Sequence, residues 1–213
     1  QQVTADDSTL KTFAVDNLAT HLRNAGKSWK AYAESIPFAG YTGFNVYPYV
    51  KRHNPFAYFQ DVIQGPEVNN IVPFSQFSVD AATGRLPNFS FVVPNLLDDA
   101  HDGTLAEADR WLIQNIQPVL SSPAFQAGGN GILIITFDES FDEDCRPSPS
   151  CDANLFEFGG RVLTVVIGPN VLRGNSSNRY MHENLLKTIS VALGLSSSPG
   201  NAASAANMNE FFK

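Results

Sequence analysis

The run Gly131–Phe137 (Gly-Ile-Leu-Ile-Ile-Thr-Phe) constrains the fold more than any other segment of the chain. It is almost continuously apolar and has the length of a strand rather than that of a helix. Strands that are buried on both faces, as in a parallel sheet, carry runs of this kind. The segment Arg161–Ile167 has the same character. Both segments therefore predict strands of a largely parallel sheet.

Helical and strand patterns alternate along the rest of the chain. We expect helices over residues 8–25, 54–65, 75–83, 104–120 and 182–193, and further strands over residues 28–33 and 88–93. Thr104 and Glu107 predict a capping box at the start of the fourth helix, and Gly194 is expected to end the fifth. Residues 41–49 are expected to form an irregular aromatic loop, and the tail from Ser196 onward to wrap loosely on the surface. This alternation predicts an α/β fold, with a mostly parallel sheet flanked by helices. The 213 residues contain no repeat and no long linker, so we expect a single domain over residues 1–213.

The charge balance excludes one class of partner. The chain has 14 Lys and Arg against 21 Asp and Glu, which gives a net charge of −7. Nucleic-acid binding needs clustered basic residues, so no nucleic-acid partner is expected. No apolar run approaches the ~18 residues of a membrane span.

Two features indicate a secreted protein. Cys145 and Cys151 are separated by a short Pro-rich loop, which predicts a local disulfide, with two free thiols as the alternative. Asn88-Phe-Ser and Asn175-Ser-Ser are glycosylation sequons. The N-terminal segment has no basic start and no apolar stretch, so either a leader was removed or the chain begins at an internal point.

Acidic clusters follow two of the predicted strands. Asp99 and His101 come after the strand at residues 88–93, and Asp138 and Glu139 come directly after the apolar run. Parallel sheets bind ligands beyond the carboxyl ends of their strands. Carboxylates that converge there repel one another unless some are protonated or a cation is bound. Oxygen donors beside imidazoles point to a divalent metal ion, with its identity open.

A solvated loop surface is the alternative for these carboxylates. We favour it for Asp142, Glu143 and Asp144, which lie beside the Pro-rich cysteine loop. Asp138 and Glu139 follow an apolar strand without a break, so we expect them at the edge of the sheet and in a functional site.

The chain has four histidines. His21 lies between polar neighbours in a predicted helix and is expected at the surface. His53 precedes a predicted helix N-terminus, a ready anion site, although an isolated histidine there is more often a cap or a surface residue. His101 stands in the acidic loop and His182 opens the last helix. Together with Asp138-Glu139, these last two form a candidate site.

Several motifs, taken in order, resemble those of one known family. They are Ser28-Trp-Lys-Ala-Tyr-Ala-Glu34, His53-Asn-Pro-Phe-Ala-Tyr-Phe59, Leu86-Pro-Asn-Phe-Ser-Phe-Val-Val-Pro-Asn95, Asp99-Ala-His101-Asp102, Thr136-Phe-Asp138-Glu139 and Tyr180-Met-His182. The set resembles the phosphoesterase family that includes fungal acid phosphatases and bacterial phospholipase C-type enzymes. The resemblance implies an alkaline-phosphatase-like α/β fold. It also implies metal ligands at Asp138, Glu139 and Asp99, and catalytic or phosphate-binding histidines at His101, His182 and His53.

One part of the family pattern is missing. Family members carry a Glu-Asn metal-binding pair and then a Ser or Thr nucleophile, in a context like His-Pro-Ser-x-Pro-Asn-Tyr. Neither occurs here, so we expect the N-terminal part of the family fold to be absent from this chain. A nicked enzyme with a separate N-terminal piece, a truncated sequence and a shortened homologue without activity are the three explanations. We favour a missing piece, because losing the first strand would expose an apolar sheet edge.

The sequence thus predicts a secreted, metal-dependent hydrolase of phosphate esters, either an acid phosphatase or a phospholipase C-like enzyme. The alternative is a non-catalytic secreted binding protein that keeps the fold. Such a protein would use the aromatic segment Tyr41–Tyr49 to hold a sugar or a lipid.

Overall fold

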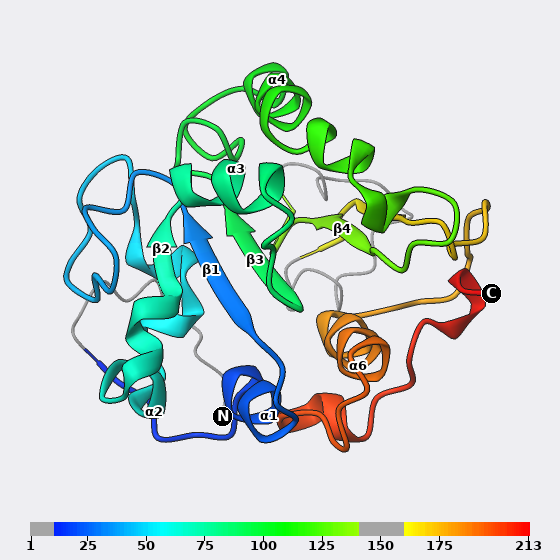
Figure 1. Cartoon of the computed structure of the whole chain (residues 1–213), viewed down its shortest axis with the longest axis horizontal. Coiled ribbons are helices and arrows are strands. Elements are labelled where there is room, and N and C mark those ends of the chain that lie inside the picture. The colour runs from blue at the N-terminus through cyan, green and yellow to red at the C-terminus, as the bar shows by residue number, and fades with distance from the viewer. Residues whose placement is uncertain (1–10, 141–159) are drawn as a thin grey trace.

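A three-stranded parallel sheet forms the centre of the structure, a computed structural model of the chain (Figure 1). The structure describes residues 11–140 and 160–213. The strands are β1 (Trp29–Ala33), β2 (Ile71–Pro73) and β3 (Phe89–Val93), arranged in the order β2-β1-β3. Both outer strands run parallel to β1. The predicted strands near residues 28–33 and 88–93 are confirmed.

Helices cover both faces of this sheet, as burial of a parallel sheet requires. The helices are α1 (Leu18–Asn24), α2 (Gln60–Ile63), α3 (Ser75–Ala82), α4 (Leu105–Asn115) and α6 (His182–Ala192). Alternate residues of β1 enter two different hydrophobic clusters. Ala31 and Ala33 pack with Leu22 of α1, whereas Tyr32 packs with Phe77 of α3 and Trp111 of α4. The result is an α/β fold in three layers.

The two apolar runs form a separate pair of strands, and their predicted direction was wrong. β4 (Leu133–Thr136) pairs antiparallel with β5 (Thr164–Ile167) in a sheet of its own. The side chains of this pair are half-buried or exposed rather than buried on both faces. A groove of about 170 Å³ separates α4 from the pair, with Leu112, Leu133 and Ile167 in its walls.

The first predicted helix is shorter than expected. Within the described residues it begins at Leu18, because the side chain of Asn17 accepts a hydrogen bond from the backbone N–H of Thr20 and caps it. Phe13 instead lies extended and pairs with Phe59 in a parallel bridge. Phe13, which fitted the apolar spacing of a helix, instead contacts the segment at Phe59.

The helix predicted over residues 54–65 is also broken. A 3₁₀ turn covers Pro55–Ala57, Phe59 is extended, and only Gln60–Ile63 is α-helical. The 3₁₀ turns of the described chain are Lys51–His53, Pro55–Ala57, Pro66–Asn70, Gln117–Ser121, Pro123–Phe125, Gly200–Ala203 and Asn209–Phe211.

The later helices match the sequence closely. The predicted capping box of α4 is present, since Thr104 and Glu107 each accept a hydrogen bond from the other's backbone N–H. The predicted helix over residues 182–193 is α6, and Gly194 ends it with a φ of 68°.

Two expectations about surface position were wrong. His21 is largely covered, because its ring contacts Asp16 on one side and Ser197 of the C-terminal segment on the other. The tail after Ser196 does not wrap loosely, since Ala202 and Met208 are buried and the backbone N–H of Met208 donates to a threonine of α6.

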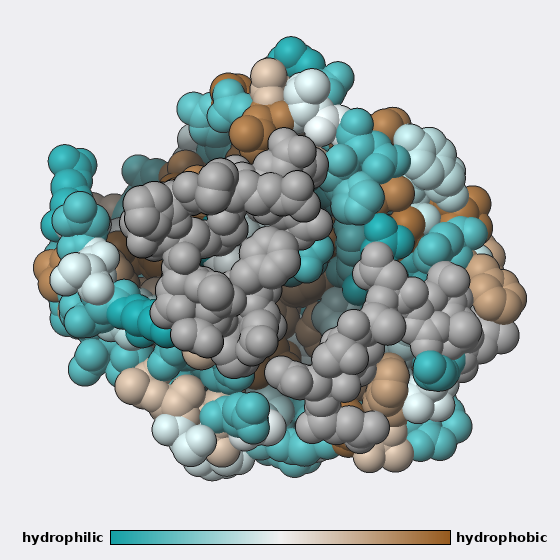
Figure 2. All heavy atoms as spheres, turned by 180° about the vertical axis from the view of Figure 1, so that it is seen from behind, coloured by the Kyte–Doolittle hydropathy of each residue, from teal (hydrophilic) through white to brown (hydrophobic). Residues whose placement is uncertain are grey.

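Hydrophobic side chains reach the surface in small separate patches on the face opposite to that of Figure 1, where described residues form it (Figure 2). Among the described residues no helix is both long and apolar enough to cross a membrane. The predicted disulfide between Cys145 and Cys151 lies outside the described residues.

Candidate active site

The carboxyl ends of β1 and β3 are joined by Glu34, the residue that follows β1. Its carboxylate accepts hydrogen bonds from the backbone N–H of Asn95 (3.0 Å) and from the indole N–H of Trp111 on α4 (2.9 Å). Burial raises the pKa of Glu34 above its ordinary value, and the nearby Asp98 carboxylate raises it further. Glu34 therefore fixes the start of the loop that carries the acidic cluster.

That loop, residues 95–103, is tightly turned around Asp99. The carboxylate of Asp99 accepts the backbone N–H of His101 at 2.8 Å, and Ala100 between them has a φ of 71°. Gly103 closes the loop against Leu97, where an added Cβ would lie 1.9 Å from the carbonyl oxygen of Leu97. These contacts set the direction of the His101 side chain.

His53 and Asp99 meet at this edge, although 46 positions separate them in the chain. Nδ1 of His53 lies 3.2 Å from Oδ2 of Asp99, and both side chains are mostly covered, with 19% and 15% exposed. The ring centroids of His53 and His101 are 6.3 Å apart. Three of the residues predicted from the sequence therefore share one site.

His101 is the more exposed of the two histidines. Its Nδ1 lies 2.7 Å from the carboxylate of Asp102, and its Nε2 lies 3.5 Å from the guanidinium of Arg52. Arg52 lies in the same 3₁₀ turn as His53. The site thus combines two imidazoles, each beside a carboxylate, with one guanidinium.

His182 lies in a second group, at the end of β4. Its Nε2 is 2.7 Å from the backbone carbonyl of Asp138. The segment before His182 is held by Glu210, whose carboxylate accepts hydrogen bonds from Tyr180, Ser176 and Asn178 at 2.6 to 3.1 Å. His182 therefore reaches the main chain beside the predicted Asp138-Glu139 pair.

The described residues contain no group of three His, Cys, Asp or Glu side chains that could hold a metal ion. The recorded contact between His182 and Asp138 uses a backbone oxygen, and the contacts of Asp99 go to His53 and to the backbone of His101. The predicted metal ligands do not make a closed site with one another in the described part of the chain.

The aromatic segment Tyr41–Tyr49 borders the first group. Partial desolvation of its hydroxyl and the neighbouring Asp102 carboxylate raise the pKa of Tyr47. Phe44, Val46 and Tyr47 are all about half exposed or more. The irregular, aromatic loop predicted here is confirmed, and it lies beside the partner of His101.

Sequence reasoning missed Arg52 and the anchoring role of Glu34. The signal for Glu34 was available, because it directly follows a buried strand, as Asp138 follows β4. Arg52 carries no comparable signal in its Lys-Arg-His context. The sequon residues Asn88 and Asn175 are both exposed, which fits their predicted modification without testing it.

This fold and site define an α/β protein whose histidines and carboxylates meet beyond the ends of parallel strands. The Phosphoesterase family profile matches residues 1–196. The chain belongs to this family, as its ordered motifs predicted.

Curated relatives include phosphatases from fungi and a bacterium. A probable acid phosphatase of Kluyveromyces lactis is 27% identical over 177 residues, which cover 78% of this chain and 38% of that protein. An acid phosphatase of Aspergillus fumigatus is 27% identical over 86% of this chain and 40% of its own length. A phosphatidylinositol-3-phosphatase of Mycobacterium tuberculosis is 30% identical over 85% of this chain and 54% of its own length. The chain thus spans 38% to 54% of these relatives.

Proposed function

We propose that the chain forms the site of a secreted, metal-dependent phosphate-ester hydrolase with an alkaline-phosphatase-like fold. The observation that carries the proposal is the group of His53, Asp99 and His101 beyond the ends of the parallel strands. Membership of the Phosphoesterase family and the names of the phosphatase relatives support it. The three-layer α/β arrangement is compatible with the proposed fold.

The proposed chemistry follows from the two histidines and their carboxylates. Asp99 lies against Nδ1 of His53 and Asp102 against Nδ1 of His101, so neither carboxylate contact uses an Nε2 atom. Nε2–H groups and the Arg52 guanidinium donate to anions such as phosphate oxygens. An imidazolium at this position can also give its proton to the leaving alcohol.

Metal dependence is the part of the proposal that rests on donor types alone. Asp138, Glu139 and Asp99 supply carboxylate oxygens, which suit divalent cations. A metal bound there would polarise a phosphoryl oxygen. The described residues form no three-ligand group, so the proposed proton transfer and phosphate binding use only the histidines and Arg52.

The test is hydrolysis of p-nitrophenyl phosphate by residues 1–213, alone and with an upstream segment that carries a Glu-Asn pair and a Ser or Thr nucleophile. We expect no turnover by the chain alone, because loss of a covalent nucleophile removes about a millionfold in rate in a serine enzyme. The upstream segment, fused or added as a separate peptide, should restore hydrolysis.

The controls separate the site from the fold. His53→Ala should abolish the restored activity, whereas His21→Ala, which removes an imidazole from α1, should leave it. Saturable turnover by the isolated chain would overturn the expectation that this chain lacks a nucleophile. Full activity of His53→Ala would overturn the proposed site.

The alternative function, a non-catalytic binding protein, is favoured by the exposure of Phe44 and Tyr47. It predicts no hydrolysis under any of these conditions and saturable binding of a sugar or a lipid. Phe44→Ser/Tyr47→Ser should weaken that binding. In the hydrolase, the same variant should keep the turnover of p-nitrophenyl phosphate.

A further inference from the structure

A second concave region lies at the amino ends of the central strands. It is a pocket of about 420 Å³ whose wall includes Arg23, Lys27, Trp29, Lys30, Asn70 and Arg85. These residues come from the end of α1, the start of β1 and the turns that precede β2 and β3. β1 separates the pocket from the candidate active site by five residues, or roughly 16 Å at ~3.3 Å per residue.

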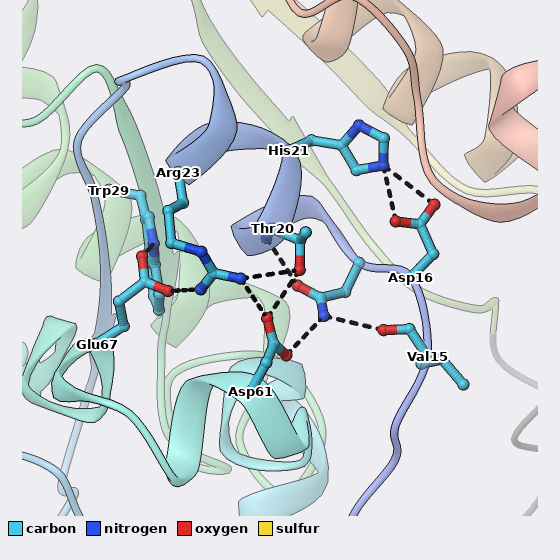
Figure 3. A network of polar contacts seen from close by, with 9 residues as sticks. Val15, Asp16, Thr20, His21, Arg23, Trp29, Asp61 and Glu67 are labelled. Atoms are coloured by element: carbon cyan, nitrogen blue, oxygen red, sulfur yellow. Dashed lines mark hydrogen bonds and ion pairs between the residues drawn. The ribbon is translucent and has the colours of Figure 1, made fainter.

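Two of the four cations in this wall are neutralised by carboxylates. Arg23 pairs with Asp61 at 2.9 Å and with Glu67, which also accepts the indole N–H of Trp29 at 3.0 Å (Figure 3). Lys30 pairs with Asp80. These groups form a fixed polar wall, and their charges are largely cancelled.

The other two cations have no such partner in the part of the chain that the structure describes. No carboxylate among residues 11–140 and 160–213 lies within ion-pair distance of Lys27 or Arg85. Within the same residues, the side-chain amide of Asn70, which also lines the pocket, makes no hydrogen bond. An ammonium, a guanidinium and an amide therefore line one pocket, and none of the three side chains is held by another side chain among the described residues.

We propose that this pocket binds a phosphate group, as a second anion site separate from the candidate active site. Arg85 offers a planar fork of N–H donors, Lys27 a compact charge and Asn70 a neutral donor. The neighbouring Leu86 and Pro87 give the pocket an apolar side, which suits a phosphate carried by a small organic molecule.

The net charge of the whole chain works against the binding of an anion. The chain carries −7, so its overall field repels anions, and a retained anion must be held by local donors. At this pocket, two cations that have no carboxylate partner among the described residues lie on one open, concave surface. A single lysine on a flat surface offers neither the second cation nor the concavity.

The two tryptophans of the chain provide separate probes for the two ends of the sheet. The indole N–H of Trp29 lies in the pocket wall and donates to Glu67. The indole N–H of Trp111 donates to Glu34 beside the candidate active site. A nitrogen-15 spectrum of the purified protein should show both indole signals, and Trp111→Phe assigns them by removing one.

The experiment is a titration of these signals with inorganic phosphate at constant ionic strength. We expect a saturable shift of the Trp29 signal. Lys27→Ser/Arg85→Ser should weaken the apparent affinity by about tenfold or more, because both charged donors to the phosphate are lost. The double variant Arg110→Ser/Arg173→Ser removes the same charge elsewhere on the surface and should leave the affinity unchanged.

Three outcomes would overturn the proposal. The Trp29 signal could stay fixed, it could move equally in Lys27→Ser/Arg85→Ser, or sodium chloride alone could move it by the same amount. A shift of Trp111 alone would place phosphate at the candidate active site and not in the pocket.

A second titration, with a sugar phosphate, distinguishes the two sources of the group. Tighter binding than that of inorganic phosphate assigns the pocket to phosphorylated organic molecules, through Leu86 and Pro87. Equal affinity assigns it to free phosphate. Either result leaves the Trp111 response as an independent test of the hydrolase proposal.

Discussion

The carboxylate of Glu34 accepts the backbone N–H of Asn95 at 3.0 Å, and this bond ties the end of β1 to the end of β3. The same carboxylate accepts the indole N–H of Trp111. One side chain thus anchors the loop that carries Asp99 and His101 to the sheet and to α4. Its protonation state consequently affects both the stability of the fold and the geometry of the site.

Glu34 should make the stability of the protein depend on pH. Its folded pKa is raised above the ordinary 4.5, so the folded state binds the proton more tightly than the unfolded state. The contribution is fully present below pH ~4.5 and is lost as the pH rises through the folded pKa. We expect the free energy of unfolding, measured with urea, to fall between pH 4 and pH 7. The fall should be smaller in Glu34→Gln, which has no carboxyl group at this position to lose a proton.

The glutamine variant also has a cost that does not depend on pH. Its NH₂ group faces one of the two N–H donors, and an unmade buried hydrogen bond costs ~1–3 kcal/mol. A difference in stability between the two proteins that stays constant from pH 4 to 7 would contradict the raised pKa. A variant of equal stability at every pH would contradict the anchoring role itself.

Asp99 should act by positioning His53. Asp99→Asn keeps the size of the side chain but removes the charge that lies 3.2 Å from the imidazole. In the active enzyme we expect kcat to fall by roughly 10²–10⁴, in the range of general acid–base contributions, with a smaller change in KM. Asp109→Asn, on the exposed face of α4, is the control and should leave both unchanged.

The fold was predictable where a local pattern decides the structure. The capping box at Thr104 and the left-handed Gly194 set helix ends through contacts within a few residues, and both were found. The apolar run of β4 specifies a strand but not the direction of its partner, which depends on the path of the intervening chain. Phe13 was misassigned for a similar reason, since its bridge partner Phe59 is 46 positions away.

The individual residues of the site could be predicted from the sequence, but their arrangement in space could not. The acidic loop and its histidine stood out because polar residues directly followed a strand. The pairing of His53 with Asp99 depends on a tertiary contact and gives no local signal. Glu34 follows a strand too, but its partners, a backbone N–H and an indole, are visible only in the folded structure.

Gly103→Ala should damage the site through the backbone. The added methyl carbon would lie 1.9 Å from the carbonyl oxygen of Leu97, so the loop that carries His101 must move. We expect a loss of about 1–3 kcal/mol in the free energy of unfolding by urea, typical of overpacking, and a loss of activity beyond that. Gly174→Ala is the matched control, because among the described residues no atom beyond its chain neighbours lies within 4 Å of its added Cβ. Equal stability of the two variants would contradict this prediction, because it would show that the loop accommodates the methyl group without strain.

Asp138 and Glu139 should carry a divalent metal ion, a proposal that rests on their donor type and their place after β4. Elemental analysis of the folded, dialysed protein should find the ion, and Asp138→Ala/Glu139→Ala should abolish it. Asp109→Ala removes a carboxylate from α4 and should change nothing.

His182 gives the metal prediction a second, graded test. Its Nε2 lies 2.7 Å from the carbonyl oxygen of Asp138, so the imidazole is already at the strand end where the ion would bind. If His182 is a ligand, His182→Ala should weaken metal affinity without abolishing it, because the two carboxylates remain. If it only holds the strand end through that carbonyl, metal affinity should stay and only the stability should fall. An unchanged metal content in Asp138→Ala/Glu139→Ala would contradict the assignment of these two carboxylates as metal ligands. If the wild-type protein hydrolyses esters without bound metal, the histidine site remains supported and metal has no part in the mechanism.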